Sequence, residues 1–189
     1  NLNGSLVGKG HPCYIIAEIG SNHNRNLAKA KKLIDVAKES GCDAVKLQSY
    51  TAEGIYSVYT PRISEMEGRS IKGETPYELI KRIEMPLEWH SVLKDYCDSV
   101  GITFSSTPFD ERMVDILESV NVPFYKVASY EITHYPMLRK IARIGKPVIL
   151  STGNSGLEDI ERAVNLLEGE GLHDYALLHC VSQYPALYE

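Results

Sequence analysis

The sequence predicts an α/β protein, a (β/α)8 TIM barrel of which the chain covers about the first six strand–helix units. Three observations predict this fold. Short runs rich in Val, Ile and Tyr alternate with longer segments of helical period, as in a parallel sheet with crossover helices. From Ile102 onward these units repeat every roughly 22 to 28 residues, the short spacing of a barrel. The chain has 189 residues, whereas a complete barrel has about 250. An open six-stranded sheet is the alternative.

The first half of the chain contains two predicted strands and three predicted helices. In chain order they are strand 14–20, helix 27–40, strand 44–48, helix 76–83 and helix 86–100. Gly41 is expected to end the first helix, and Pro86 suits the first turn of the last one. The polar stretch 49–75 has no clear period and is typical of a functional or mobile loop.

Strands and helices alternate without interruption in the second half. They are strand 102–107, helix 111–120, strand 124–129, helix 135–145, strand 147–153, helix 157–171 and strand 175–180. This regular succession favours a parallel sheet whose strands all end at one edge.

Composition and charge exclude several classes of protein. A net charge of −5 and a pI near 5.7 argue against an indiscriminate nucleic-acid binder. No apolar run approaches the ~18 residues that a bilayer span needs, and the first residues do not resemble a secretory signal. Because the sequence lacks an initiator Met, its start is expected to be trimmed or not recorded. Four cysteines lie far apart, which excludes a zinc or dithiol motif and predicts reduced core residues of a cytoplasmic protein.

Polar and charged residues occur in or just after every predicted strand. They are Glu18, Lys46, Gln48, Ser105, Ser106, Thr107, Lys126, Ser129, Glu131, Ser151, Thr152 and His179. Such residues are costly in buried parallel strands unless they converge on a ligand. The lysines and hydroxyls are suited to phosphate and carboxylate oxygens. The carboxylates of Glu18 and Glu131 are candidates for proton transfer, for orienting a water or for binding sugar hydroxyls.

Each of these residues also has a simpler interpretation. Lys46 or Lys126 could extend its amine to solvent, pair with a carboxylate, or serve as the Schiff-base lysine of an aldolase. At least two of the strand-end hydroxyls are expected only to cap helices or hold turns. A dinucleotide site is excluded, because the first strand is followed by one glycine where three are needed.

The six histidines form no local metal motif. His11, His90 and His173 are expected to be solvated, and His134 to act in the turn before Pro136. His23 and His179 fall at strand ends, where a structural hydrogen bond is the favoured role over a metal ligand or general acid.

Six motifs, in order, resemble the sialic acid synthase family: N-acetylneuraminate synthase and related nonulosonic acid synthases, including spore-coat polysaccharide homologues. The motifs are AEIGSNHN (17–24), DAVKLQSY (43–50), FSSTPFD (104–110), YKVASYEI (125–132), KPVILSTG (146–153) and LLHCVSQYP (177–185). The family's fold is a (β/α)8 barrel. Its members condense phosphoenolpyruvate with an N-acetylated hexosamine.

The resemblance implies a role for each matching residue. Residues that hold the phosphate and carboxylate of phosphoenolpyruvate are Lys46, Thr107, Lys126, Ser129 and Ser151. Ser182 stands where similar enzymes often have an asparagine that reaches the phosphate. Contacts to the acceptor sugar are Glu18, Gln48, Phe109 and Tyr184. Glu131 matches a carboxylate that orients the attacking water or handles its proton, and it is the implied catalytic residue together with the two lysines.

The resemblance also implies a cofactor and partners. The aldehyde needs a divalent ion, Mn2+ or Mg2+, whose protein ligands are expected outside this chain. A longer, homodimeric protein is expected, with the remaining barrel and a C-terminal antifreeze-like domain. N-acetylmannosamine is the default acceptor, with legionaminic and pseudaminic acid synthesis as alternatives. The competing functions are a Schiff-base aldolase and a non-catalytic sugar- or anion-binding module.

Overall fold

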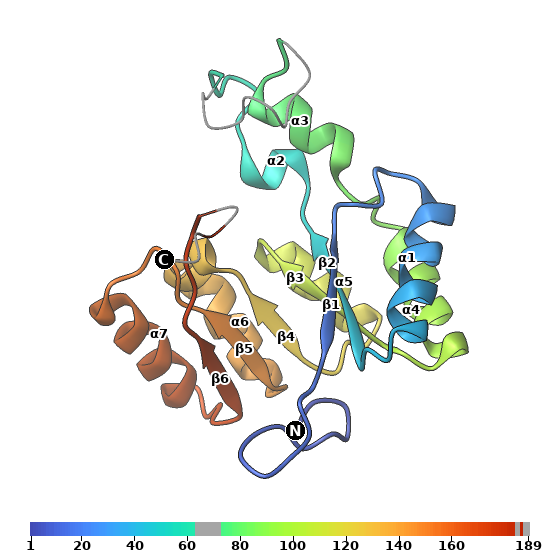
Figure 1. Cartoon of the computed structure of the whole chain (residues 1–189). Helices are drawn as coiled ribbons and strands as arrows, with labels where there is room; N and C mark the ends of the chain where they lie inside the picture. The colour runs from blue at the N-terminus through green and yellow to red at the C-terminus, as the bar shows by residue number, and fades with distance from the viewer. Residues whose placement is uncertain (63–72, 184–185, 187–189) are drawn as a thin grey trace. The chain divides into compact units, whose positions relative to one another are not determined.

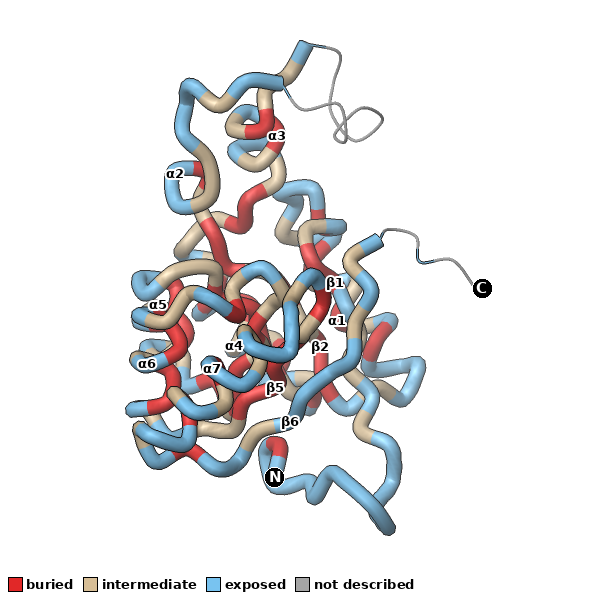
Figure 2. Tube along the Cα trace, turned by 90° about the vertical axis from the view of Figure 1, so that its left-hand side faces the viewer, coloured by how far each residue is buried: buried red, intermediate tan, exposed pale blue. Residues whose placement is uncertain are grey.

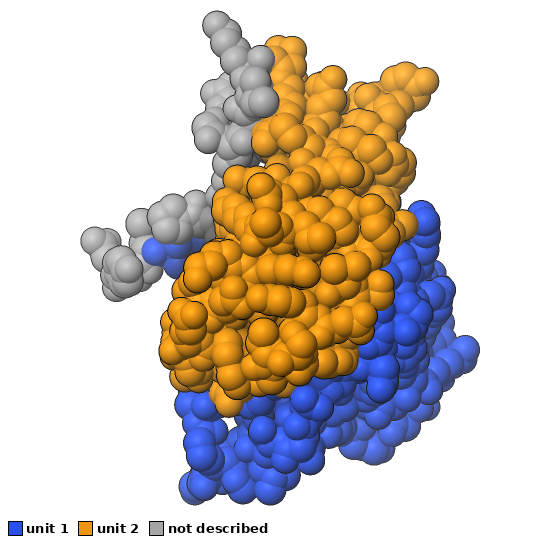
Figure 3. Space-filling view, turned by 90° about the vertical axis from the view of Figure 1, so that its right-hand side faces the viewer, with its two compact units in different colours: residues 1–14, 105–189 blue, residues 15–104 orange. Residues whose placement is uncertain are grey.

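The structure, a computed structural model, describes residues 1–62, 73–183 and 186, and Figure 1 shows the whole chain. The chain divides into two units, which Figure 3 colours separately. Unit 1 contains Asn1–Tyr14 and Ser105–Glu189, and unit 2 contains Ile15–Phe104. The division therefore falls inside the third strand.

Unit 2 is built on parallel strands and the helices that follow them. Its elements are β1 (Ile16–Gly20), α1 (Leu27–Glu39), β2 (Ala44–Ser49), α2 (Ala52–Ile55), α3 (Pro76–Ile83), α4 (Trp89–Val100) and the first residues of β3 (Thr103–Pro108). β1 and β2 are parallel, with Glu18 opposite Lys46, and β2 stands between β1 and β3 in the sheet. Figure 1 shows α2 and α3 beyond the carboxyl end of β2.

Helix α1 illustrates how the sequence determines these elements. The Asn26 side chain caps its first turn by accepting a backbone N–H. Ala30, Ile34 and Ala37 recur at helical spacing and form its buried face. This face holds α1 against β1, β2 and α4.

Unit 1 repeats the strand–helix alternation. After the end of β3 come α5 (Glu111–Ser119), β4 (Tyr125–Val127), the 3-10 helix η2 (Ser129–Thr133), α6 (Tyr135–Ile144), β5 (Val148–Ser151), α7 (Leu157–Gly169) and β6 (Tyr175–Leu178). β5 pairs in parallel with β4 on one side and β6 on the other. All four residues of β5 are buried, whereas most of β6 is exposed (Figure 2).

The predicted α/β class with parallel strands is confirmed, and three local predictions are corrected. The loop expected over 49–75 contains the one-turn helix α2, and its residues 63–72 lie outside the described part. The strand expected over 124–129 ends at Val127, and η2 follows. Helix α4 begins at Trp89 rather than Pro86, because a tight turn with a hydrogen bond from the Trp89 N–H to the Pro86 carbonyl precedes it.

The cysteine prediction holds in part. All four thiols are free, but only Cys97 is buried, and Cys13 is exposed. Cys42 and Cys180 are half-buried. Among the described helices, none combines the length and the apolar character that crossing a membrane requires.

Candidate active site

The carboxyl ends of β1 and β2 bring two predicted site residues into contact. Glu18 and Lys46 are opposite each other in the parallel register, and the Lys46 ammonium forms an ion pair with the Glu18 carboxylate. The Lys46 side chain is 14% exposed and that of Glu18 is 49% exposed. A largely buried ammonium is costly without a partner, so Glu18 stabilises the charge of Lys46. The carboxylate pairing that the sequence left open for Lys46 is confirmed.

Gly20 lets the Glu18 carboxylate lie directly against the main chain. The β1–β2 register shifts between Glu18 and Gly20, and Gly20 has a φ of +53°, which disfavours other residues. A Cβ at this position would lie 3.0 Å from Glu18 Oε1 and 3.9 Å from Gln48 Oε1. The glycine therefore makes room for a carboxylate and an amide side by side.

Gln48 is linked to Ser21 and Tyr50, two residues that the sequence reasoning did not assign to the site. The Ser21 Oγ donates to Gln48 Oε1 at 3.3 Å and lies 2.5 Å from Tyr50 Oη. Tyr50 is buried, and burial raises the pKa of its phenol, against a smaller lowering by the hydrogen bond to Ser21. The phenol therefore keeps its proton.

Two histidines near these strands are buried and structural. His23 accepts the Arg25 backbone N–H at Nδ1, and its Nε2 has no hydrogen-bond partner among the described residues. The prediction that His90 is solvated is wrong. His90 is buried because the α4 face that carries it also carries the buried Leu93 and Cys97.

The buried imidazole of His90 is hydrogen-bonded at both nitrogens. Its Nε2 lies 2.8 Å from Ser49 Oγ and its Nδ1 lies 2.8 Å from the Leu87 carbonyl oxygen. Burial is the main cause that lowers the pKa of His90, so the ring is neutral. The neutral ring carries its proton on Nδ1, which donates to the Leu87 carbonyl oxygen, and Nε2 accepts the proton of the Ser49 hydroxyl.

In unit 1, Lys126 on β4 contacts the end of β5. Its Nζ donates to Ser151 Oγ at 2.5 Å and to the Val127 carbonyl oxygen at 2.8 Å. The acceptors of these two hydrogen bonds are neutral oxygens. An anion that approaches this ammonium would gain a charge-assisted hydrogen bond.

Three side chains crowd around Gly153, directly after β5. The Gly153 N–H donates to Ser129 Oγ at 3.1 Å. A Cβ on Gly153 would lie 2.6 Å from Ser182 Oγ, 3.0 Å from Ser129 Oγ and 3.2 Å from the Cys180 Cβ. Two hydroxyls from η2 and from the segment after β6 therefore meet over a backbone that only glycine provides.

Glu131 on η2 is a half-buried carboxyl with an unsatisfied oxygen. Its Oε2 is buried and has no hydrogen-bond partner among the residues described. Burial raises the pKa of Glu131, while its own backbone N–H and the charge of Lys126 act in the opposite direction. A carboxyl whose pKa is raised in this way holds a proton more readily than an ordinary glutamate and is a candidate for proton transfer.

The remaining predicted residues lie in or after β3, β5 and β6. Thr107 is buried near the end of β3, and Phe109 is half-buried just after it. Tyr184 lies outside the described residues. His179 is exposed. Thr152 Oγ1 donates to the Leu178 carbonyl oxygen at 2.8 Å, so this hydroxyl links the ends of β5 and β6 rather than holding a turn.

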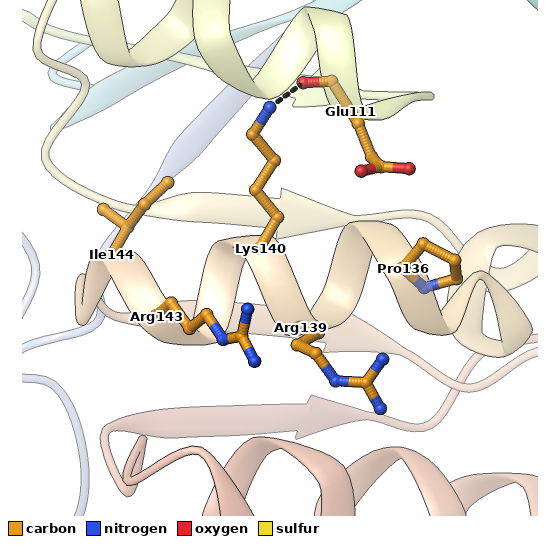
Figure 4. A pocket seen from close by; sticks show the side chains of 6 residues that line it. All are labelled: Glu111, Pro136, Arg139, Lys140, Arg143 and Ile144. Carbon is orange, nitrogen blue, oxygen red and sulfur yellow. Dashed lines mark hydrogen bonds between the residues drawn. The ribbon is translucent and has the colours of Figure 1, made fainter.

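A cavity of about 530 Å³ lies along α6 (Figure 4). Its lining residues are Glu111, Pro136, Arg139, Lys140, Arg143 and Ile144. Its cations already have partners, because Arg139 and Arg143 pair with Glu170 and Lys140 pairs with Asp115. Figure 4 also shows Lys140 donating to the Glu111 carbonyl oxygen. None of the predicted site residues lines this cavity.

Comparison with known proteins adds a family and several relatives. A profile described as NeuB family matches residues 33–189. The chain is 39% identical over 180 residues to the spore coat polysaccharide biosynthesis protein SpsE of Bacillus subtilis, covering 95% of this chain and 48% of that protein. It is 40% identical over 186 residues to the N,N'-diacetyllegionaminic acid synthase of Legionella pneumophila, covering 96% of this chain and 52% of that protein.

A solved structure agrees with these matches. The N-acetylneuraminic acid (sialic acid) synthetase of Leptospira borgpetersenii superposes with a TM-score of 0.84 at 31% identity, covering 100% of this chain and 61% of that one. The chain spans about half the length of the curated relatives it matches.

Proposed function

The chain belongs to the NeuB family, and from this premise we propose that it is part of a synthase that condenses phosphoenolpyruvate with an N-acetylated hexosamine. The products are a nonulosonic acid and phosphate, and N-acetylmannosamine is the default acceptor. One observation carries the proposal: Ser129 and Ser182 gather over Gly153, directly after the strand whose Ser151 accepts from Lys126. Such a set of donors is suited to a phosphate or carboxylate.

The proposal includes a (β/α)8 barrel, of which residues 1–189 form the N-terminal portion. Strand neighbours in each sheet follow the order of the sequence, β1-β2-β3 and β4-β5-β6. A doubly wound sheet reverses its strand order at a switch point, so the consecutive order supports the barrel. The remaining barrel strands and a C-terminal antifreeze-like domain belong to the proposed full-length protein.

In the proposed reaction, C3 of phosphoenolpyruvate forms a bond to the aldehyde carbon of the open-chain sugar. Water then adds to C2, and the tetrahedral intermediate loses phosphate as its C2–O bond breaks. Lys126, Ser129, Ser151 and Ser182 would bind the anionic groups. The raised pKa of Glu131 supports a role in taking the proton of the attacking water.

The β1–β2 residues supply the proposed acceptor contacts. Lys46 adds positive charge for phosphoenolpyruvate, and Glu18 and Gln48 are the acceptors and donors for sugar hydroxyls. β3 contributes Thr107 for phosphoenolpyruvate, and Phe109, just after β3, is a proposed sugar contact. Tyr184 is the last of the proposed sugar contacts.

A divalent ion, Mn2+ or Mg2+, stays in the proposal with its protein ligands outside this chain. Among the described residues, no group of three or more His, Cys, Asp or Glu side chains is arranged to hold a metal ion. The roles described above are assigned only to side chains of this chain. The four free thiols support a reducing compartment such as the cytoplasm, and a second copy of the full-length protein is the proposed partner.

The test is phosphate release from phosphoenolpyruvate by the longest polypeptide that the gene encodes, with Mn2+ and a panel of N-acetylhexosamines. Release with one sugar supports the proposal and identifies the acceptor. Lys126→Met should abolish release, whereas Lys140→Met, at a surface lysine of α6, should not. Borohydride trapping of a pyruvate adduct would instead indicate a Schiff-base aldolase. Binding of phosphoenolpyruvate without turnover on any sugar would indicate a binding module.

A further inference from the structure

The side-chain amide of Gln48 is the end of a chain of three polar groups. Ser21 Oγ donates to Gln48 Oε1 at 3.3 Å, and 2.5 Å separates Ser21 Oγ from Tyr50 Oη. Ser21 directly follows β1, and Tyr50 directly follows β2. The chain of hydrogen bonds therefore ties the ends of two neighbouring strands together at the predicted sugar contact.

The direction of these hydrogen bonds follows from counting protons. A serine hydroxyl has one proton to donate. Since Ser21 gives its proton to Gln48, the short contact with Tyr50 requires the phenol to donate to Ser21. Tyr50 is buried, and its raised pKa keeps that donor proton in place.

This direction determines what Gln48 offers to a ligand. With Oε1 accepting from Ser21, the remaining hydrogen-bonding group is the Nε2 amide, which donates two N–H bonds. Gln48 Oε1 and Glu18 Oε1 both lie within 4 Å of the position that a Cβ on Gly20 would take. A carboxylate only accepts hydrogen bonds, so Gln48 offers an NH2 donor group and Glu18 offers an acceptor.

We propose that Ser21 and Tyr50 are positioning residues that orient the Gln48 amide so that its NH2 donates to an oxygen of the acceptor sugar. The inference rests on the proposed function and deepens it. It assigns the acceptor a hydrogen-bond-accepting oxygen at Gln48 and a hydroxyl donor at Glu18.

The kinetic test uses Tyr50→Phe and Ser21→Ala in the longest polypeptide that the gene encodes. Each change should raise the KM of the acceptor sugar by about three- to tenfold, the worth of one hydrogen bond. The KM of phosphoenolpyruvate and kcat should stay within about twofold. Because Tyr50 acts through Ser21, the double variant should be no worse than Ser21→Ala.

Two further variants separate positioning from a general loss of structure. Ser21→Thr keeps the hydroxyl and should restore a normal KM for the acceptor. Tyr77→Phe removes the phenol of a half-buried tyrosine that donates to Glu53 in the same unit, and it should change neither KM. Equal rises in both KM values, or additive effects in the double variant, would overturn the inference.

A spectroscopic readout makes the inference independent of turnover. Residues 1–189 contain two glutamines, Gln48 and Gln183, so selective ¹⁵N-glutamine labelling gives few side-chain amide signals from this part of the protein. The Gln48 signals, identified by their loss in Gln48→Glu, should move in Ser21→Ala and Tyr50→Phe and stay in Tyr77→Phe. Unmoved Gln48 signals would overturn the inference even in an active enzyme, whereas moved signals without phosphate release would refute only the proposed function.

Discussion

Replacing Gly153 by alanine tests the geometry of the proposed anion site most directly. The new Cβ would lie 2.6 Å from Ser182 Oγ and 3.0 Å from Ser129 Oγ. To reach an ordinary contact of about 3.4 Å, the Ser182 hydroxyl must retreat by about 0.8 Å. Either the Ser182 side chain rotates or the segment after β6 moves, and the hydrogen bond from the Gly153 N–H to Ser129 is disturbed as well.

The expected magnitude follows from these contacts. Overpacking of this kind lowers the free energy of unfolding by about 1–3 kcal/mol. Displacement of one hydroxyl from a bound anion should weaken phosphoenolpyruvate binding by about tenfold or more. The assays are urea unfolding and calorimetric titration with phosphoenolpyruvate.

Two matched variants make the Gly153 result interpretable. Gly169→Ala lies at the end of α7, where a Cβ meets nothing within 4 Å. It should leave the affinity for phosphoenolpyruvate unchanged and leave the free energy of unfolding unchanged or slightly higher. Adding Ser182→Gly to Gly153→Ala removes the closest of the new contacts and should recover part of the lost stability without restoring binding. Wild-type affinity for phosphoenolpyruvate in Gly153→Ala would refute the reasoning.

Three further predictions concern side chains near the strand ends. Lys46→Ala should abolish phosphate release, whereas Lys32→Ala, at an exposed lysine of α1, should leave it intact. Because burial raises the pKa of Glu131, the folded state holds a proton that the unfolded chain releases between the ordinary and the raised pKa. Stability should therefore fall as pH rises through this window, and Glu131→Gln should lose that slope in urea unfolding measured upward from the ordinary pKa of a glutamate. Ser49→Ala leaves the buried Nε2 of His90 without its partner and should cost about 1–3 kcal/mol in urea unfolding.

Each of these predictions has a contrary outcome. Unchanged turnover in Lys46→Ala would remove that lysine from the site. Parallel pH profiles for wild type and Glu131→Gln would show that the carboxyl has no shifted titration. A loss below about 0.5 kcal/mol in Ser49→Ala would mean that solvent reaches the imidazole of His90.

The sequence predicted most elements because their patterns are long and periodic. The helix over 76–83 has the predicted bounds, and α1 ends within one residue of its expected end. Helix α2 was missed because Ala52–Ile55 is a single turn, too short to show a helical period. His90 was misplaced because its burial depends on tertiary packing of α4, which a lone polar residue in the sequence does not reveal.

The sequence predicts polar side chains at the strand ends, but it does not predict which of them make contact within each unit. The alternation of predicted strands and helices places Glu18 and Lys46 near strand ends, but their ion pair depends on the register between β1 and β2. The roles of Gly20 and Gly153 are set by distances across the chain, although a lone glycine at a strand end is a signal of close backbone approach. Ser21 had no such signal.

Strand β6 has a consequence for handling this polypeptide in solution. Among the described residues it pairs with β5 alone, and Leu177, Leu178 and the nearby Val181 are exposed. An apolar strand with an open backbone edge is a template for adding a further strand from another molecule. The 189-residue polypeptide by itself should therefore self-associate, and its apparent mass in light scattering should rise with concentration. Ala176→Lys, on β6, should suppress that rise.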